Sequence, residues 1–279
     1  MTLDEIAEVR PGLLDFTAGM LGGLARKDQR AAGELYVRGL LADGRRKSMV
    51  ATAERPGVDS QRLQPFITSS TRDCVAVRRN VARWLAGHQP AEALVAGDTG
   101  FPGDGDASPS VARQYSGTPG KTANCQVAVS VHLVSEHAPR AAHWRLSCPE
   151  SGDDPAPDDP AAAAGARRRR RLAAIPGQAG HREKRRLAPD MIQEMTGPGG
   201  WGVPAVAGGA RPVAAAGIAY GDNALFRQRL TGGGRQYAVA VKGPASARDG
   251  DAVPQARPCE NSRSSSPSSS APALPAPSR

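Results

Sequence analysis

The chain has 279 residues and carries 36 Lys and Arg against 27 Asp and Glu, a formal net charge of +9 at pH 7. This positive balance favours a polyanionic partner such as nucleic acid. Hydrophobic residues make up 39% of the chain, and no apolar run approaches the roughly 18 residues of a membrane span. The four cysteines lie far apart without paired spacing, so composition excludes membrane-spanning and disulfide-framework proteins.

Helical patterns fill the N-terminal part of the chain. Over Lys27–Leu41, apolar side chains recur on one side at helical spacing. The clearest helix runs from a cap at Ser70 or Thr71 to Gly87, since glycine is common just past the end of a helix. The sequence therefore predicts a helical region at the start of the chain.

Residues 93–134 hold the most informative pattern. A short apolar run, Leu94–Ala96, meets an acid, Asp98, at its end, and Val127, Val129 and Val131 later alternate with small or polar residues as in a half-buried strand. Between them we expect a long polar loop with amide and cationic side chains, including Arg113, Gln114 and Lys121. Such an acid and such donors suit a metal ion and a phosphate backbone. The alternative is a surface hairpin with ordinary turn residues.

Basic clusters follow a second expected strand, Ala142–Cys148. Residues 149–166 are almost all Pro, Asp, Ala and Gly, a composition typical of a disordered linker. Pro189 should end or kink the helix-like segment beyond it. The cationic residues of this region are Arg167, Arg168, Arg169, Arg170, Arg171, Lys184 and Arg185. We expect them to contact phosphate, and a solvated basic loop is the alternative.

The last third of the chain predicts a strand, a turn and a helix, followed by one more strand. Val213–Ala216 is the first strand, and Asp222 or Asn223 is expected to cap the helix after the turn. Tyr237–Val241 is the second strand. Residues 257–279 are a Ser-, Pro- and Ala-rich tail that we expect to be disordered.

A long string supplies a resemblance to a known family. DTGF, beginning at Asp98, and the later SPSVARQYSGTPGKTANCQVAVSVH resemble the first active-site block of insertion-sequence transposases of the acidic-triad (DDE) type. Residues 28–49 are similar to the family's helical N-terminal region, and residues 175–195 to its stretch between the first two acids. The resemblance extends over about residues 14–256.

The resemblance implies a mixed α/β fold in three parts. Residues 1–88 would form a helical, DNA-binding-like region, and residues 89–256 an incomplete ribonuclease-H-like catalytic domain interrupted by the linker. The disordered tail would follow from residue 257. The resemblance further implies Mg²⁺ as cofactor, bound by three acids, for the cleavage and transfer of DNA strands.

The acids themselves depart from the family pattern. Asp98 fills the first catalytic and metal-binding position, because it directly precedes Thr99-Gly100-Phe101. The string that ends in Tyr220-Gly221-Asp222 resembles the family's ADAxYGD and places Gly217 at the second acid. Asp222 is the nearest substitute metal ligand, although a helix-cap role also explains it. No third acid is recognised after residue 256, so we expect a truncated or frame-shifted copy with impaired catalysis.

The sequence thus predicts the transposase of an insertion sequence, a cytoplasmic, nucleoid-associated protein that binds the element's double-stranded terminal repeats. Self-association or association with intact transposase is expected, and no membrane partner. One alternative is a non-catalytic DNA-binding remnant that occupies element ends or interferes with intact transposase. Another is a product that does not fold stably.

Overall fold

The computed structural model describes residues 3–42, 49–54, 60–68, 73–88, 91–105, 108, 110–116, 120–149, 159–172, 180–203 and 212–243. The chain divides into two units, Met1–Lys242 and Gly243–Arg279. The predicted tail and residues 150–158, half of the predicted linker, lie outside the described residues. None of the helices in the described ranges has the length and apolar character that crossing a bilayer requires.

The N-terminal region is helical, as the sequence predicts. Its helices are α1 (Leu3–Glu8), α2 (Arg10–Leu21), α3 (Lys27–Leu41), α4 (Met49–Glu54), α5 (Ser60–Thr68) and α6 (Cys74–His88). The bounds of α3 are those expected from the apolar spacing. Asp73 caps α6, because its Oδ1 accepts hydrogen bonds from the backbone N–H groups of Val75 (3.0 Å) and Ala76 (2.9 Å). The expected caps Ser70 and Thr71 lie outside the described residues.

Helix α6 joins this helical region to the sheet. On one side it packs against α2, where Val77 and Val81 cover a small apolar cluster that contains Met20, Leu21, Leu24 and Phe66. On the other side it packs against a strand, and Ala82 is fully buried in the main core. The helix therefore packs against two partners, the helical region and the sheet.

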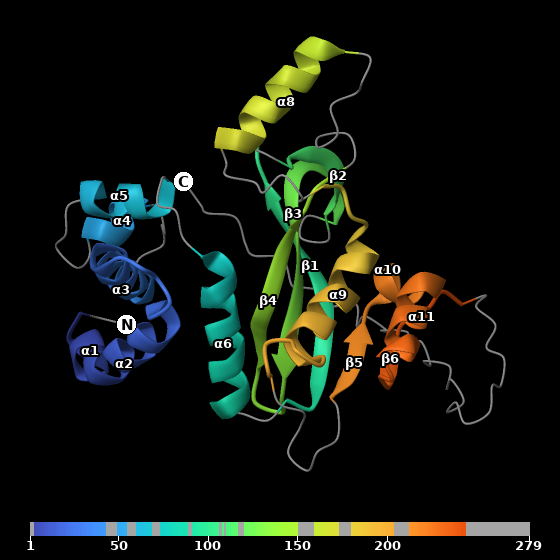
Figure 1. Ribbon diagram of the computed structural model, residues 1–279, viewed down its shortest axis with the longest axis horizontal. Coiled ribbons are helices and arrows are strands. Elements are labelled where there is room, and N and C mark those ends of the chain that lie inside the picture. Colours follow the sequence, from blue (N-terminus) through green and yellow to red (C-terminus); the bar gives the residue numbers. More distant parts are fainter. Residues whose placement is uncertain are drawn as a thin grey trace, which may run out of the picture. The chain divides into compact units, whose positions relative to one another are not determined.

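A single mixed sheet follows (Figure 1). Its strands are β1 (Ala93–Pro102), β2 (Ala112–Ser116), β3 (Lys121–Val134), β4 (Pro139–Ser147), β5 (Val213–Ala216) and β6 (Tyr237–Val239). The order is β4-β3-β1-β5-β6, with β3 antiparallel to β1 and β4, and with β5 and β6 parallel to β1. This is the ribonuclease-H-like order, and the expected mixed α/β fold class is confirmed. Strand β2 pairs with β3 beyond the end of β4.

The polar loop expected after Asp98 is largely strand. β1 continues to Pro102, and β2 and β3 form a hairpin that takes in much of the expected loop. Gly100 of β1 lies very close to the hairpin, because a Cβ there would lie 1.8 Å from the Oγ of Ser116 on β2. The hairpin approaches β1 so closely that a side chain at this position would clash with it. The glycine of the DTGF string, a residue type common in turns, is therefore needed here for the close approach of two strands.

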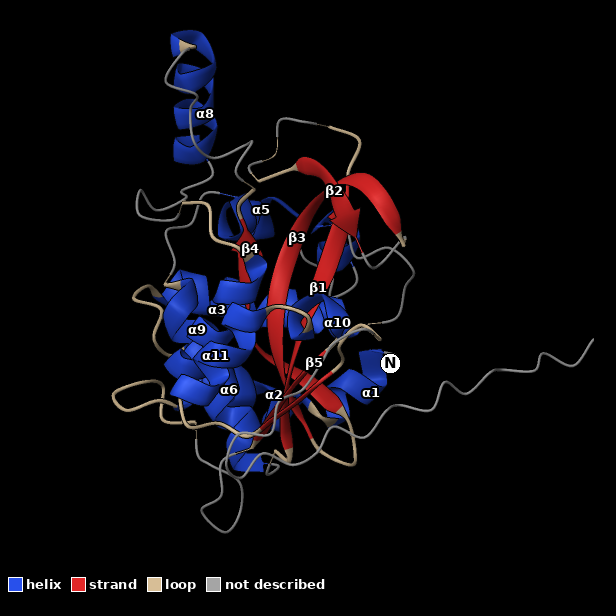
Figure 2. Ribbon diagram, turned by 90° about the vertical axis from the view of Figure 1, so that its right-hand side faces the viewer, coloured by secondary structure: helices blue, strands red, loops and turns tan. Residues whose placement is uncertain are grey.

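One face of the sheet carries the main core. Val127, Val129 and Val131 on β3 are buried, as the alternating pattern predicts. Helix α9 (Lys184–Thr196) covers them with Leu187, Ala188, Met191, Ile192 and Met195. Figure 2 shows α9 and α11 (Ala224–Gly232) on the same side of the strands.

Pro189 does not end α9, so of the two effects expected from the sequence, an end or a kink, the first does not occur. The helix runs through this residue, which is buried. A proline inside a helix costs about 3 kcal/mol, whereas each fully buried Leu, Ile or Met side chain contributes about 1.5–3 kcal/mol. Several such residues on one stripe of α9 outweigh the penalty.

The predicted linker also contains structure. Residues 160–166 are not a disordered linker but the first turns of α8 (Pro160–Leu172), which also carries the arginine run. The helix starts with proline at its first position, and the Oδ1 of Asp159 accepts a hydrogen bond from the N–H of Ala161 at 3.0 Å. Alanine has the highest helix propensity, so a run that reads as low complexity is also a good helix.

The C-terminal elements agree closely with the sequence. β5 has the predicted bounds, and β6 ends at Val239, two residues earlier than expected. A short helix, α10 (Ile218–Gly221), precedes α11. The cap of α11 is Asn223, whose Oδ1 accepts a hydrogen bond from the N–H of Phe226 at 3.0 Å, which decides between the two candidate caps.

Candidate active site

Asp98 lies on β1 close to the end of the parallel neighbour β5. In the register of these strands Ala96 pairs with Ala216, the last residue of β5, so Asp98 and Gly217 both lie just beyond this pair. Adjacent strands are about 4.8 Å apart. Asp98, at the first acid position, and Gly217, which aligns with the second acid, therefore lie side by side, on β1 and directly after β5.

The carboxylate of Asp98 has a partner on each oxygen. The Nζ of Lys184, the first residue of α9, lies 3.3 Å from Oδ2. The hydroxyl of Tyr220 on α10 donates a hydrogen bond to Oδ1. The side chains of Asp98 and Lys184 are 26% and 30% exposed. Three elements that are distant in sequence thus meet at this one carboxylate.

Tyr220 is a site residue that the sequence analysis did not single out. Its side chain is buried, and its ring lies 5.5 Å from that of Phe226 between centroids. Burial raises the pKa of the Tyr220 hydroxyl, and the negative charge of Asp98 raises it further. The hydroxyl therefore stays protonated and acts as a donor. The YGD string was the signal that marked this position.

Gly217 is the residue before α10, exposed and with an ordinary φ of −70°. A Cβ built there meets no other atom within 4 Å. Packing and backbone conformation therefore do not require glycine at this position. A carboxylate side chain would fit at this position, so the structure gives no reason for the glycine that the sequence has there.

Asp222 holds the end of α10 to the residues after β6. Its Oδ1 accepts a hydrogen bond from the backbone N–H of Lys242 at 2.9 Å, and its Oδ2 lies 3.3 Å from the Nζ of the same residue. The backbone hydrogen bond, helped by the lysine charge, lowers the pKa of this carboxyl. The structure thus gives Asp222 a bridging contact of its own, and its role as a metal ligand is a separate proposal.

The residues at Asp98 do not fit a two-metal centre. Mg²⁺ takes oxygen ligands, and two-metal sites need several carboxylates. In the described part of the chain no group of three or more His, Cys, Asp or Glu side chains is placed to hold a metal ion. Both oxygens of Asp98 already have an internal partner. The segment beyond Gly243, where a third acid was sought, lies outside the described residues.

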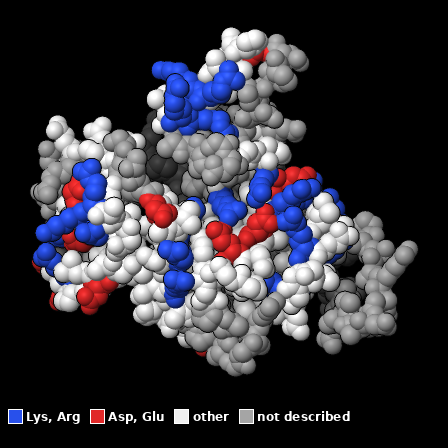
Figure 3. Space-filling model, viewed as in Figure 1, with Lys and Arg blue, Asp and Glu red and all other residues white. Residues whose placement is uncertain are grey.

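The predicted nucleic-acid contacts lie in several places. Arg113 and Lys121 are exposed on the β2–β3 hairpin, whereas the Nε2 of Gln114 donates to the Cys125 carbonyl at 3.0 Å and holds the hairpin together. The side chains of Arg167, Arg168 and Arg171 are exposed on α8, over which Lys and Arg gather in Figure 3. Arg169 and Arg170 belong to the same helix. Arg185 pairs with Glu183. Of all these residues, only Lys184 has a described contact with Asp98.

A second charged cluster lies under α9 and was not anticipated. The Nε2 of His143 on β4 lies 2.9 Å from the Oε2 of Glu194, and Arg145 pairs with the same oxygen. The His143 side chain is completely buried and stacks on Trp201, with ring centroids 4.2 Å apart. Burial lowers the pKa of His143 to about 4, against the opposing effect of Glu194. Burial disfavours the charged form of Glu194, but His143 and Arg145 outweigh it and lower its pKa.

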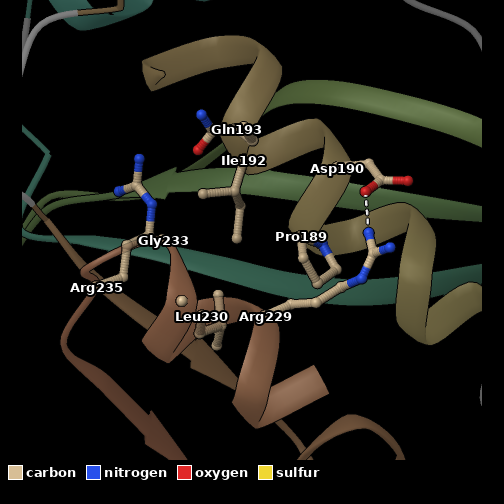
Figure 4. Close-up of a pocket in the computed structure, with 9 residues that line it drawn as sticks. Pro189, Asp190, Ile192, Gln193, Arg229, Leu230, Gly233 and Arg235 are labelled. Carbon is tan, nitrogen blue, oxygen red and sulfur yellow. Dashed lines mark hydrogen bonds and ion pairs between the residues drawn. The ribbon is translucent and has the colours of Figure 1, made fainter. Parts of the chain in front are cut away.

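A cavity of about 290 Å³ lies between α9 and α11 (Figure 4). Asp190 on α9 and Arg229 on α11 form an ion pair across its rim, and Ile192 and Leu230 line it. Its lining includes none of the three residues that meet at Asp98. The cavity is therefore separate from the candidate active site.

The strand order and the acid on its first strand define a class, that of ribonuclease-H-like nucleases and strand transferases. Residues 19–279 match a family model described as DDE superfamily endonuclease, and the chain belongs to this family. The match begins within α2 and runs past residue 256 into the Ser/Pro-rich segment. Endonucleases of this superfamily act on nucleic acid and typically use divalent metal ions. No curated protein matches the sequence.

Proposed function

We propose that this chain is the transposase of an insertion sequence that binds the ends of its element but is impaired in strand cleavage. One observation carries the proposal. Asp98 keeps the place of the first acid on β1, while Gly217 stands where β5 should present the second. In an active relative Mg²⁺ would be the expected ion, and the cell's nucleoid the expected place of action.

The chemistry explains the expected impairment. Two divalent ions activate the attacking oxygen and stabilise the leaving oxygen in phosphodiester cleavage. A glycine has no side chain with which to hold either ion. Loss of a residue that merely supports a metal ligand costs about 10–100-fold in affinity or activity, so loss of a ligand at Gly217 should cost more.

Exposed cations support the DNA-binding part of the proposal. Arg113 and Lys121 are exposed on the hairpin, and the exposed Arg167, Arg168 and Arg171 of α8 form a further basic surface. Purified protein should bind duplex DNA with log K falling by about 0.9 per phosphate contact for each tenfold rise in salt. Binding that does not weaken with salt, or no binding at low salt, would refute this part.

The cleavage part is tested on DNA that carries the parent element's ends, with Mg²⁺ or Mn²⁺. We expect no nicking or strand transfer by the natural chain. Gly217→Asp is the variant to compare, because the position accepts a side chain without a clash. Metal-dependent nicking by the natural chain that disappears in Asp98→Ala would contradict the proposal, and Asp222 would then be the first alternative ligand to test.

A second candidate function is that of a non-catalytic remnant that occupies element ends or interferes with intact transposase. The internal partners of Asp98 favour it, because Lys184 and Tyr220 engage both oxygens of the carboxylate. Addition of the chain to an intact transposase should then lower excision in proportion to its share of the mixture. If excision is unaffected by an excess of the chain, this second function is wrong.

A further inference from the structure

We propose that the ammonium group of Lys184 serves as the permanent cation of Asp98, so that the natural chain binds no divalent ion at this carboxylate. The proposal rests on the assignment of Asp98 as the first acid, made above. It adds that Lys184 replaces the ion there, and it assigns this lysine a role different from that of the basic residues around it.

The contacts at Asp98 carry the argument. Lys184 Nζ is 3.3 Å from Oδ2, and the buried Tyr220 hydroxyl donates to Oδ1. A divalent ion bound to Oδ2 would lie close to the ammonium group of Lys184. Two neighbouring cations repel each other strongly in a partly buried site. Metal binding would therefore require Lys184 to leave.

Packing keeps Lys184 in place. It is the first residue of α9, and the buried stripe of this helix, which includes Leu187 and Met191, fixes the helix on the sheet. The first residue of the helix therefore lies beside Asp98 of β1. The neighbouring arginines have other carboxylates as partners: Arg182 pairs with Asp190, and Arg185 and Arg186 pair with Glu183. Lys184 is the cation of this cluster that contacts Asp98.

The charge balance at the strand ends agrees with this role. One carboxylate and one ammonium form a neutral pair, whereas carboxylates at Asp98 and at position 217 without the ammonium would form a doubly negative pair that a divalent ion could neutralise. Gly217 has room for that side chain. The glycine at position 217 and the contact of Lys184 with Asp98 thus act together, because each makes a metal ion unnecessary for neutralising the carboxylate.

The test measures Mn²⁺ binding to the full chain by calorimetry, without DNA. The natural chain and Asp98→Asn should give the same isotherm, because Asp98 binds no ion. The double variant Lys184→Met with Gly217→Asp should gain a site at least about tenfold tighter than any site of the natural chain, and this site should disappear when Asp98→Asn is added. Lys121→Met with Gly217→Asp is the charge-matched control, since Lys121 is exposed on the hairpin, and it should gain no such site.

Each other outcome overturns the proposal. Mn²⁺ binding by the natural chain that is lost in Asp98→Asn would show that Lys184 does not exclude the ion. Absence of a new site in the double variant, or an equal site in the Lys121 control, would show that Lys184 is not the cause. The salt dependence of DNA binding is measured separately, so failure here leaves the DNA-binding proposal to its own test.

Discussion

Helix α9 holds a charged cluster near each of its ends, and the two clusters differ in their access to water. At the first end Lys184 meets Asp98, and both side chains keep about a quarter to a third of their surface exposed (26% and 30%). Near the other end Glu194, itself 30% exposed, meets a completely buried His143, which stacks on Trp201. Removing the partner of a buried group costs more than breaking an exposed ion pair. We therefore expect the His143–Glu194 cluster to affect mainly the stability of the fold. The Lys184–Asp98 pair should affect mainly the binding of cations.

The largest expected effect is a pH dependence of stability that arises from His143. Its pKa in the folded chain is about 4 against an ordinary 6.5. Between these values the unfolded chain binds a proton that the folded chain does not, so stability falls as the pH falls. The loss amounts to about 3 kcal/mol over this interval. Urea unfolding at a series of pH values measures it.

Two variants separate the contribution of His143 from the loss of stability that acid causes through other groups. His143→Phe should reduce the slope of unfolding free energy against pH by about 1 kcal/mol per pH unit between pH 4 and 6.5. His137→Gln, at a histidine whose side chain is 63% exposed, should leave the slope unchanged. Equal slopes for His143→Phe and the natural chain would mean that the buried cluster does not depend on a neutral histidine.

Loss of the carboxylate of the same cluster ranks second. Glu194→Gln removes the charge that binds His143 and Arg145. Because Glu194 is 30% exposed, the cost is smaller than for a fully buried pair, about 2 kcal/mol. Glu136→Gln is the control, since its side chain is 77% exposed, and should change the unfolding free energy by less than about 0.5 kcal/mol. Similar losses for both variants would remove the distinction between the two clusters.

Local patterns in the sequence predicted many of the elements. The spacing over Lys27–Leu41 and the strand Val213–Ala216 depend on near neighbours, and the structure confirms both. The cap of α11 was expected at Asp222 or Asn223, and the structure has Asn223. The errors have a common cause in distant packing. Pro189 is tolerated because α9 is buried against a sheet, and the glycine of DTGF is required by a hairpin that approaches β1. Neither contact is visible in a short window.

The site was predictable only in part for the same reason. Asp98 followed from the DTGF string, and Lys184 was expected to contact phosphate, not an acid of the chain itself. The partners of Asp98 are separated from it by 122 residues in the case of Tyr220. The Glu194 partner of His143 is 51 residues away, on a different element. Spacing rules for metal ligands and helix faces do not reach across such separations.

Tyr220→Phe should have a smaller effect than either change in the buried cluster. It removes one hydrogen bond to Asp98 but leaves the buried ring in place. Water can replace the hydroxyl at a carboxylate that is 26% exposed, so we expect a loss of about 1 kcal/mol in chemical unfolding. Tyr115→Phe, at a tyrosine that is 63% exposed, should be neutral. If Tyr220→Phe costs as much as Glu194→Gln, the site at Asp98 is as closed as the cluster under Trp201.

The smallest change in stability is expected for Lys184→Met. An ion pair whose side chains are 26% and 30% exposed is open to water and contributes about 0–1 kcal/mol, and methionine keeps most of the apolar stem of lysine. Chemical unfolding should therefore place this variant within about 0.5 kcal/mol of the natural chain. Its consequence should appear in binding instead, since removal of the ammonium leaves Asp98 with the Tyr220 hydroxyl and an oxygen open to solvent or to an added cation. A large loss of stability in Lys184→Met would assign the Asp98 cluster to the fold, and the two ends of α9 would then differ in exposure but not in role.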